Sequence, residues 1–259
     1  MHQAADHHAP APGTYAHRPY PSAEAAAADM AREGAAFLRE RIAAAGTASV
    51  VLTGGSSPGP LYRHWAEDHR DAVDWRAVHF FWGDERNVPP GSPESNTTTS
   101  ALLLDHVPVD TAKLHRWRTE LPPADALDDM EAALRSARCA APEGRFDLVL
   151  LGVGGDGHVA SLFPHDAPWR DLAEAPGEGV RDGGHTGGTP APVRFVDDSP
   201  KPPAERYTFT LPVLRAARRV WLMPFGEAKA EVRRRVLARD RDLPASWLGG
   251  GGGEAVVWG

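Results

Sequence analysis

Asp156, Gly157 and His158 follow the apolar run FDLVLLGV of residues 146–153 after two glycines. This order places a carboxylate and an imidazole at the end of a candidate strand. A neutral histidine can accept a proton from water, because the pKa of imidazole lies near neutrality. A histidine presented on a glycine-rich turn at a strand end is therefore a candidate general base.

The glycines of the same stretch allow a second interpretation. Gly152, Gly154 and Gly157 fit the G-x-G-x-x-G spacing of a dinucleotide fingerprint. That fingerprint requires a helix after the third glycine and an acidic residue at the end of the next strand. Pro164 follows within a few residues and the next apolar strand is distant, so we reject a dinucleotide site. We expect an open turn that exposes Asp156 and His158.

A second polar cluster, Gly54-Gly55-Ser56-Ser57, follows the apolar stretch ASVVLT and precedes a proline-rich helix start. Glycine N–H groups, serine hydroxyls and the free N–H groups of a helix start suit a phosphate. The cluster lacks the lysine of a P-loop. A tight strand-to-helix turn with a capping serine explains the same residues equally well.

A third cluster, Asp84-Glu85-Arg86, follows the aromatic residues FFW. An isolated charged triplet is usually a solvated turn, but its place at a strand end favours a site. Arg86 could hold an anionic oxygen, and Asp84 could bind sugar hydroxyls or orient a base.

These clusters need a scaffold, and the chain supplies strands that are apolar throughout and alternate with helices. We expect strands over residues 48–55, 77–85, 146–154, 206–211, 218–225 and 254–259. We expect helices over residues 22–45, 58–69, 95–107, 124–140 and 226–240, and a short helix between the strands at 206–211 and 218–225. This pattern predicts a single doubly wound α/β domain, with a mainly parallel sheet and helices on both faces. Ligands of such sheets lie at the carboxyl ends of the strands, where all three clusters fall.

The remaining segments have the composition of loops. Residues 1–20, rich in Ala, Pro and His, predict a flexible N-terminal arm, and residues 21–259 form the single domain. Residues 173–192 are dense in Gly and Pro and predict a long flexible loop. The five glycines at residues 249–253 predict a slack connection.

Composition limits the classes of function. The 259 residues carry a formal charge of −7, whereas nucleic-acid binders are more often basic. Cys139 is the only cysteine, so no intrachain disulfide forms, which suits a reducing compartment. The sequence has no apolar run of membrane-spanning length and no apolar signal-peptide core at its start. We therefore expect a cytoplasmic protein, a monomer or weak homodimer, that binds neither nucleic acid nor membrane.

Five stretches together resemble the 6-phosphogluconolactonase family. They are LTGGSSP, WGDERNVP, GVGGDGHVASLFP, SPKPPAERYTFTLPVL and GEAKA, which occur in family order between about residues 48 and 232. Ser57 stands where the family usually has threonine, and the 173–192 loop is expanded. The resemblance implies hydrolysis of 6-phosphoglucono-δ-lactone to 6-phosphogluconate in the pentose phosphate pathway, without a metal or a cofactor.

For this reaction, we expect His158 to be the general base. Asp156 or Asp84 would orient its imidazole or bind sugar hydroxyls. Arg86 or the N–H groups of the turn would stabilise the oxyanion. The phosphate is expected on the 54–57 cluster, near a cation at the start of the last helix. The candidates for substrate and phosphate binding are Gly54, Gly55, Ser56, Ser57, Lys201, Arg206 and Lys229. Lys229 could instead be an ordinary helix-surface lysine, and Arg206 a strand-edge charge.

Two other functions are alternatives to lactone hydrolysis: an amino-sugar deaminase of the same superfamily, and a sensor from another class of protein. Deaminases of the same superfamily carry Asn-Glu shortly after the Asp-Gly-His, where this chain has Leu162 and Phe163. The missing carboxylate argues against amino-sugar chemistry. A non-catalytic sugar-phosphate sensor would use the same phosphate loop, but such domains are usually joined to a DNA-binding segment, and the sequence shows none.

Overall fold

The computed structural model of the protein describes residues 14–140, 144–165, 169 and 191–259. The strands are β1 (Ala16–Arg18), β2 (Ala48–Leu52), β3 (Val78–Trp82), β4 (Asp84–Arg86), β5 (Leu114–His115), β6 (Leu148–Gly152), β7 (Val193–Val196), β8 (Arg206–Phe209), β9 (Arg219–Met223) and β10 (Glu254–Trp258). The helices are α1 (Ala23–Ala45), α2 (Gly59–Glu67), α3 (Asn96–Leu104), α4 (Pro123–Ala140), α6 (Leu211–Arg215) and α7 (Ala230–Leu237).

Seven strands form one sheet in the order β1-β10-β9-β6-β2-β3-β5, and every pair in it is parallel. From β2 the chain builds outward to β3 and β5, and then returns to the other side of β2 with β6, β9 and β10. The strand order therefore reverses between β2 and β6, and ligand sites of open α/β sheets lie at such a point.

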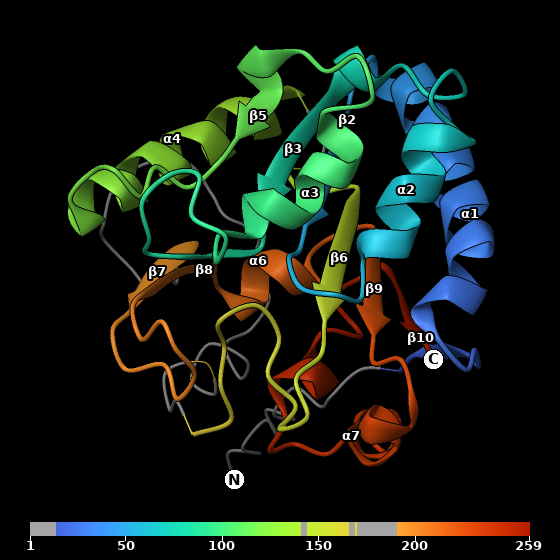
Figure 1. Ribbon diagram of the computed structural model, residues 1–259, viewed down its shortest axis with the longest axis vertical. Helices are drawn as coiled ribbons and strands as arrows, with labels where there is room; N and C mark the ends of the chain where they lie inside the picture. Colours follow the sequence, from blue (N-terminus) through green and yellow to red (C-terminus); the bar gives the residue numbers. More distant parts are fainter. Residues whose placement is uncertain (1–13, 141–143, 166–168, 170–190) are drawn as a thin grey trace, which may run out of the picture.

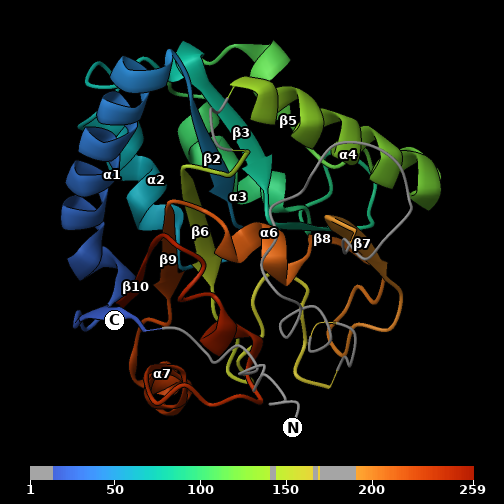
Figure 2. The ribbon, with the colours of Figure 1, turned by 180° about the vertical axis from the view of Figure 1, so that it is seen from behind.

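Helices lie on both faces of this sheet, as predicted. α3 lies in front of it in Figure 1, and α4 comes to the front in the reverse view of Figure 2. All five residues of β2 are buried, as are the first four of β6, because a strand covered on both faces must be apolar on both.

The helix layer that contains α1 packs closely because α1 is rich in small residues. A Cβ added at Gly34 would lie 2.6 Å from the indole of Trp65 on α2. The Trp65 indole N–H also donates to the carbonyl of Ala31 at 3.0 Å. Ser22 caps this helix, as its hydroxyl accepts from the Ala25 N–H, and Gly46 ends it with a φ of 78°.

A second, antiparallel sheet in the order β4-β8-β7 differs from the prediction. The triplet Asp84–Arg86, predicted to be a polar cluster at the end of the strand over residues 77–85, is a separate strand, β4, that pairs with β8. The strand predicted over residues 206–211 forms as β8 but belongs to this smaller sheet. β7 lay outside the predicted strands, although it pairs with β8 along its length.

The prediction of a flexible arm over residues 1–20 was wrong for Ala16–Arg18, because these residues form strand β1. It pairs in parallel with β10. The Tyr15 hydroxyl donates to the Ala245 carbonyl at 2.5 Å and accepts from the Gly249 N–H at 2.9 Å. A domain boundary at residue 21 therefore leaves out an edge strand of the sheet. Residues 1–13, and the predicted loop 173–192 up to residue 190, lie outside the described residues.

The glycine run at residues 249–253 was predicted to be slack, but the structure packs it against the backbone. A Cβ at Gly251 would lie 1.9 Å from the Arg215 carbonyl oxygen, and one at Gly253 would lie 2.1 Å from that of Ala217. Glycine is required there because no side chain fits. No helix among the described residues is both long and apolar enough to cross a membrane.

A buried carboxylate fixes the end of the sheet opposite the strand-end clusters. Asp147, just before β6, is 2% exposed. One of its oxygens accepts from the N–H and hydroxyl of Ser49 on β2. The other accepts from Arg41 on α1 at 2.8 Å and is paired with Arg218 at 3.2 Å. Asp147 thus ties one helix and two strands together.

We predict that Asp147→Ala lowers the free energy of unfolding by about 2–4 kcal/mol, because it leaves arginines and a buried hydroxyl without their acceptor. Urea denaturation should show a lower midpoint with an unchanged slope. Asp71→Ala is the control, since the Asp71 side chain is 94% exposed. Equal stability of the two variants would contradict the structural role of Asp147.

Candidate active site

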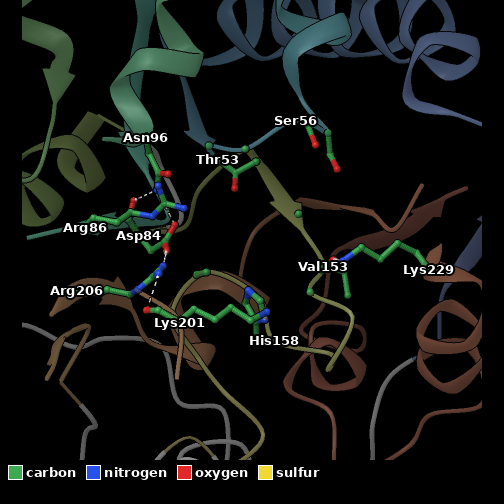
Figure 3. A pocket seen from close by; sticks show the side chains of 16 residues that line it. Thr53, Ser56, Asp84, Arg86, Asn96, Val153, His158, Lys201, Arg206 and Lys229 are labelled. Atoms are coloured by element: carbon green, nitrogen blue, oxygen red, sulfur yellow. Dashed lines mark hydrogen bonds and ion pairs between the residues drawn. The ribbon is translucent and has the colours of Figure 1, made fainter. Parts of the chain in front are cut away.

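A pocket of about 260 Å³ lies where the strand order reverses, at the carboxyl ends of β2, β3 and β6. Every site residue predicted from the sequence lines it, except Asp156, which contacts His158. The lining residues are Thr53, Gly54, Gly55, Ser56, Ser57, Asp84, Arg86, Asn96, Gly152, Val153, Gly154, His158, Ala160, Lys201, Arg206 and Lys229. Figure 3 shows them converging from both sheets and from the segment before α7.

The glycines after β6 allow a tight turn, and this turn leaves room for the imidazole of His158. The Gly154 N–H donates to the His158 carbonyl at 2.9 Å, and the Gly157 N–H donates to the Gly154 carbonyl at 3.0 Å. A Cβ at Gly154 would lie 1.9 Å from Nδ1 of His158. Residues 158–165 contain no helix, so the requirement of a dinucleotide fingerprint is not met there.

His158 and Asp156 form a hydrogen-bonded pair on this turn. Nδ1 of His158 lies 2.5 Å from Oδ1 of Asp156. Partial burial raises the pKa of Asp156, but the hydrogen bond and charge of His158, together with the charge of Lys201, outweigh it and hold that pKa well below its usual range. An ionised Asp156 accepts a hydrogen bond from the Nδ1–H group, which leaves Nε2 as the nitrogen with a free lone pair.

Lys201 lies beside this pair. Its Nζ is 3.2 Å from Nδ1 of His158 and 3.5 Å from Oδ1 of Asp156. The sequence placed Lys201 with the phosphate candidates, whereas in the structure its side-chain nitrogen contacts His158 and Asp156.

Asp84 anchors the opposite wall of the pocket (Figure 3). It is 6% exposed. Its carboxylate accepts from Asn96 Nδ2 at 2.9 Å and from the Ser161 hydroxyl at 2.7 Å. Nη1 of Arg206 lies 3.9 Å away. The carboxylate is thus bonded to the start of α3, to the segment after the histidine turn and to β8.

Arg206 is a buried charge, not the strand-edge charge that the sequence left open. Its Nε donates to the Pro203 carbonyl at 3.0 Å, and its Nη2 donates to the carbonyls of Lys201 and Pro202. Burial lowers the pKa of Arg206, and the charge of Asp84 opposes that effect. These bonds make Arg206 a brace for residues 201–203.

Arg86 and Glu85 have separate surroundings. Nη1 of Arg86 donates to the Glu94 carbonyl, and its buried Nε has no hydrogen-bond partner among the described residues. Glu85 faces the start of α3, where it accepts from the Asn96 N–H at 2.8 Å and from the Ser95 hydroxyl at 2.8 Å. Burial raises the pKa of Glu85, and these hydrogen bonds oppose the increase.

The cluster after β2 and Lys229 form a third wall. Gly55 has a φ of +81°, and a Cβ at Gly54 would lie 2.0 Å from Oδ1 of Asn96, so both positions need glycine. Ser56 is exposed on the loop that leads into α2. Nζ of Lys229 donates to the Val153 carbonyl at 2.8 Å. Burial and the charge of Lys201 lower the pKa of Lys229.

The sequence missed Asn96, Thr53 and Ser161 as members of this region. Ser95 caps α3, as its hydroxyl accepts from the Thr97 N–H at 3.1 Å, and Asn96 is the first residue of that helix. A polar residue directly after a cap, near a strand-end cluster, was the available signal. Nothing in the local sequence marks Ser161, whose partner Asp84 lies 77 residues away.

Within the described ranges, no three or more His, Cys, Asp or Glu side chains are grouped so that they could hold a metal ion.

Comparison with known proteins places the chain among sugar-phosphate enzymes. A 6-phosphogluconolactonase from Streptomyces coelicolor is 40% identical over 245 residues, which cover 88% of this chain and 87% of the relative. One from Haemophilus influenzae is 32% identical over 185 residues, or 71% of this chain and 70% of the relative.

Solved structures agree on the fold. The 6-phosphogluconolactonase from Thermotoga maritima superposes with a TM-score of 0.74 at 28% identity, over 95% of this chain and 98% of the other. A monomeric glucosamine-6-phosphate deaminase, at 19% identity and a TM-score of 0.69, shares the fold alone. The sequence pattern of one family, described as glucosamine-6-phosphate isomerases/6-phosphogluconolactonase, matches residues 21–258. The resemblance seen in the sequence is confirmed, and the chain belongs to this family.

Proposed function

We propose that the protein hydrolyses 6-phospho-D-glucono-1,5-lactone to 6-phospho-D-gluconate, a step of the oxidative pentose phosphate pathway. The observation that carries the proposal is the His158–Asp156 pair facing a pocket lined by four cationic side chains. The relatives named 6-phosphogluconolactonase support the same reaction. Residence in the cytoplasm and a monomeric or weakly dimeric state stay predictions.

The proposed reaction begins with His158. Because Asp156 holds the proton on Nδ1, Nε2 takes a proton from water as the water oxygen attacks the lactone carbonyl carbon. The carbonyl oxygen becomes an oxyanion, and Arg86 or the N–H groups of the glycine turn stabilise it. The ring C–O bond then breaks, and the imidazolium gives its proton to the departing ring oxygen. The free histidine is regenerated and the product is the open-chain acid.

The phosphate end of the substrate is assigned to the loop Gly54–Ser57 and to Lys229. The loop offers N–H groups and hydroxyls at the start of α2, and Lys229 adds a cation on the same wall. A dianionic phosphate would compensate the charge of a lysine that burial otherwise disfavours.

The residue at position 163 favours a lactone over an amino sugar. Phe163 is 1% exposed, and its ring lies 4.8 Å from that of His158. It supports the imidazole by packing but has no group that can exchange a proton. Opening an amino-sugar ring needs an acid–base group near the ring oxygen, whereas a lactone already has an electrophilic carbonyl carbon.

We predict rapid hydrolysis of 6-phosphogluconolactone and no ammonia release from glucosamine 6-phosphate. Acid release is followed at mildly acidic to neutral pH against a no-enzyme control, because the lactone also hydrolyses unaided. Ammonia well above background would replace the proposal with deaminase chemistry. Inactivity on both substrates, with tight sugar-phosphate binding, would favour the sensor.

His158→Asn is predicted to reduce kcat/KM by roughly 10²–10⁴-fold, the effect of losing a general base. The fold should persist, because the side chain lies on a pocket-lining turn. His165→Asn is the matched control, since His165 is exposed on the same segment and does not line the pocket. Near-wild-type turnover in a folded His158→Asn protein would remove His158 from the mechanism.

Lys229→Ala is predicted to weaken the binding of 6-phosphogluconate by about 10–100-fold, as expected for losing one charged hydrogen bond to phosphate. Binding of unphosphorylated gluconate should change little. Calorimetry with both ligands measures the difference, and Lys113→Ala, whose lysine lies outside the pocket lining, serves as control. If both affinities change equally, or neither changes, the phosphate lies elsewhere.

A further inference from the structure

We infer that Lys201 is a positioning residue that holds the Asp156–His158 pair and disfavours the protonated imidazole, rather than a ligand of the phosphate. The inference rests on the proposed function, in which His158 must start each turnover neutral. Lys201 reaches the pair from the segment between β7 and β8, whereas the loop that we propose to bind the phosphate follows β2 (Figure 3).

The backbone of Lys201 is held in place from two sides. The Ser199 hydroxyl donates to the Lys201 carbonyl at 2.9 Å. Nη2 of Arg206 donates to the same carbonyl at 3.2 Å, and Arg206 is itself anchored at Asp84. The side chain therefore starts from a fixed point, and its position at the pair is a property of the fold.

The distances decide which atoms share protons. A separation of 2.5 Å between Nδ1 of His158 and Oδ1 of Asp156 requires a proton between them. Because Asp156 is held ionised, that proton belongs to Nδ1, which then cannot accept from Lys201. The ammonium of Lys201 instead faces the Asp156 oxygen, 3.5 Å away. The three atoms form a triangle, in which Nζ of Lys201 lies within 3.5 Å of both members of the pair.

This triangle places two opposite charges beside the imidazole. Asp156 stabilises the imidazolium, and the Lys201 ammonium, 3.2 Å from Nδ1, destabilises it. Lys229 lines the same pocket and adds to the positive side, while Arg206 lies behind the Phe163 ring that packs on His158. Lys201 thus compensates for Asp156: the aspartate fixes the tautomer without trapping His158 in its protonated form.

Lys201→Met tests this role through the pH dependence of kcat/KM. Without the cation the imidazolium is more stable, so the neutral base appears only at higher pH. The acid limb of the profile, where kcat/KM falls as His158 becomes protonated, should move upward by about 0.5–1 pH unit. This is the size of effect expected for a half-exposed charge screened by solvent. Lys201→Arg should restore the wild-type limb, and Lys113→Met, which removes a lysine outside the pocket lining, should leave it unchanged. Asp156→Asn should move it downward.

The NMR titration of the His158 ring, assigned by comparison with His158→Asn, gives the same readout without activity. An unmoved titration and an unmoved acid limb in Lys201→Met would overturn the inference. So would a loss of 6-phosphogluconate affinity, with gluconate affinity kept and the limb unmoved, because Lys201 would then bind phosphate. If the wild type lacks lactonase activity, the proposed function fails, and the titration still tests the effect of Lys201 on His158.

Discussion

The pocket depends on one buried carboxylate, that of Asp84. An ionised group removed from water is tolerated only when hydrogen bonds and an opposite charge compensate it. Here Asn96 and Ser161 donate to its two oxygens, and Arg206 supplies the charge. Because these partners come from α3, from the segment after the histidine turn and from β8, one carboxylate joins three parts of the chain. Arg206 in turn braces the carbonyl of Lys201, so the constraint extends across the pocket to His158.

The parallel sheet and its three strand-end clusters were predictable from the sequence. Fully apolar strands that alternate with helices favour a parallel sheet, and β2, β3 and β6 are neighbours in it. Their carboxyl ends must therefore lie at one edge, which brings Ser57, Asp84 and His158 together without any knowledge of loop conformation. Topology alone therefore places the polar clusters that follow β2, β3 and β6 around one pocket.

The antiparallel sheet was not predictable, because its evidence is spread along the chain. Asp84, Glu85 and Arg86 look like a solvated turn until β8, more than a hundred residues later, pairs with them. Burial of Glu85 is tolerated because the Ser95 hydroxyl and the Asn96 N–H donate hydrogen bonds to its carboxylate. The local sequence gives no indication of these bonds. Strand β1 is only three residues long, and it is held by pairing with β10, which lies at the other end of the chain.

The glycines after β6 illustrate how one spacing can serve two physical purposes. In a dinucleotide site they let a pyrophosphate approach the backbone. Here Gly154 leaves room for the imidazole, and a Cβ at Gly157 would lie 2.6 Å from the side chain of Leu243. Gly157 also has a φ of +89°, which an L-residue rarely adopts. The glycine spacing alone cannot separate these uses, but Pro164 and the absence of a following helix can.

Charge inside the pocket differs from charge on the whole chain, and this difference bears on the substrate. The protein carries a formal charge of −7, whereas the pocket has four cationic side chains, and the carboxylates of Asp84 and Asp156 are both engaged by protein donors. Local fields in clefts, rather than net charge, attract an ionic ligand.

The four cations do not have the same task, however. Arg206 is committed to backbone carbonyls and, on the inference above, Lys201 to the dyad. Arg86 donates to the Glu94 carbonyl and Lys229 to that of Val153, which leaves further N–H groups on each for a ligand. Two cations with free donors on separate walls match a substrate that has a dianionic phosphate at one end and a developing oxyanion at the other. On the proposed function, the different roles of these like charges, set by what each one already binds, would orient the lactone toward His158.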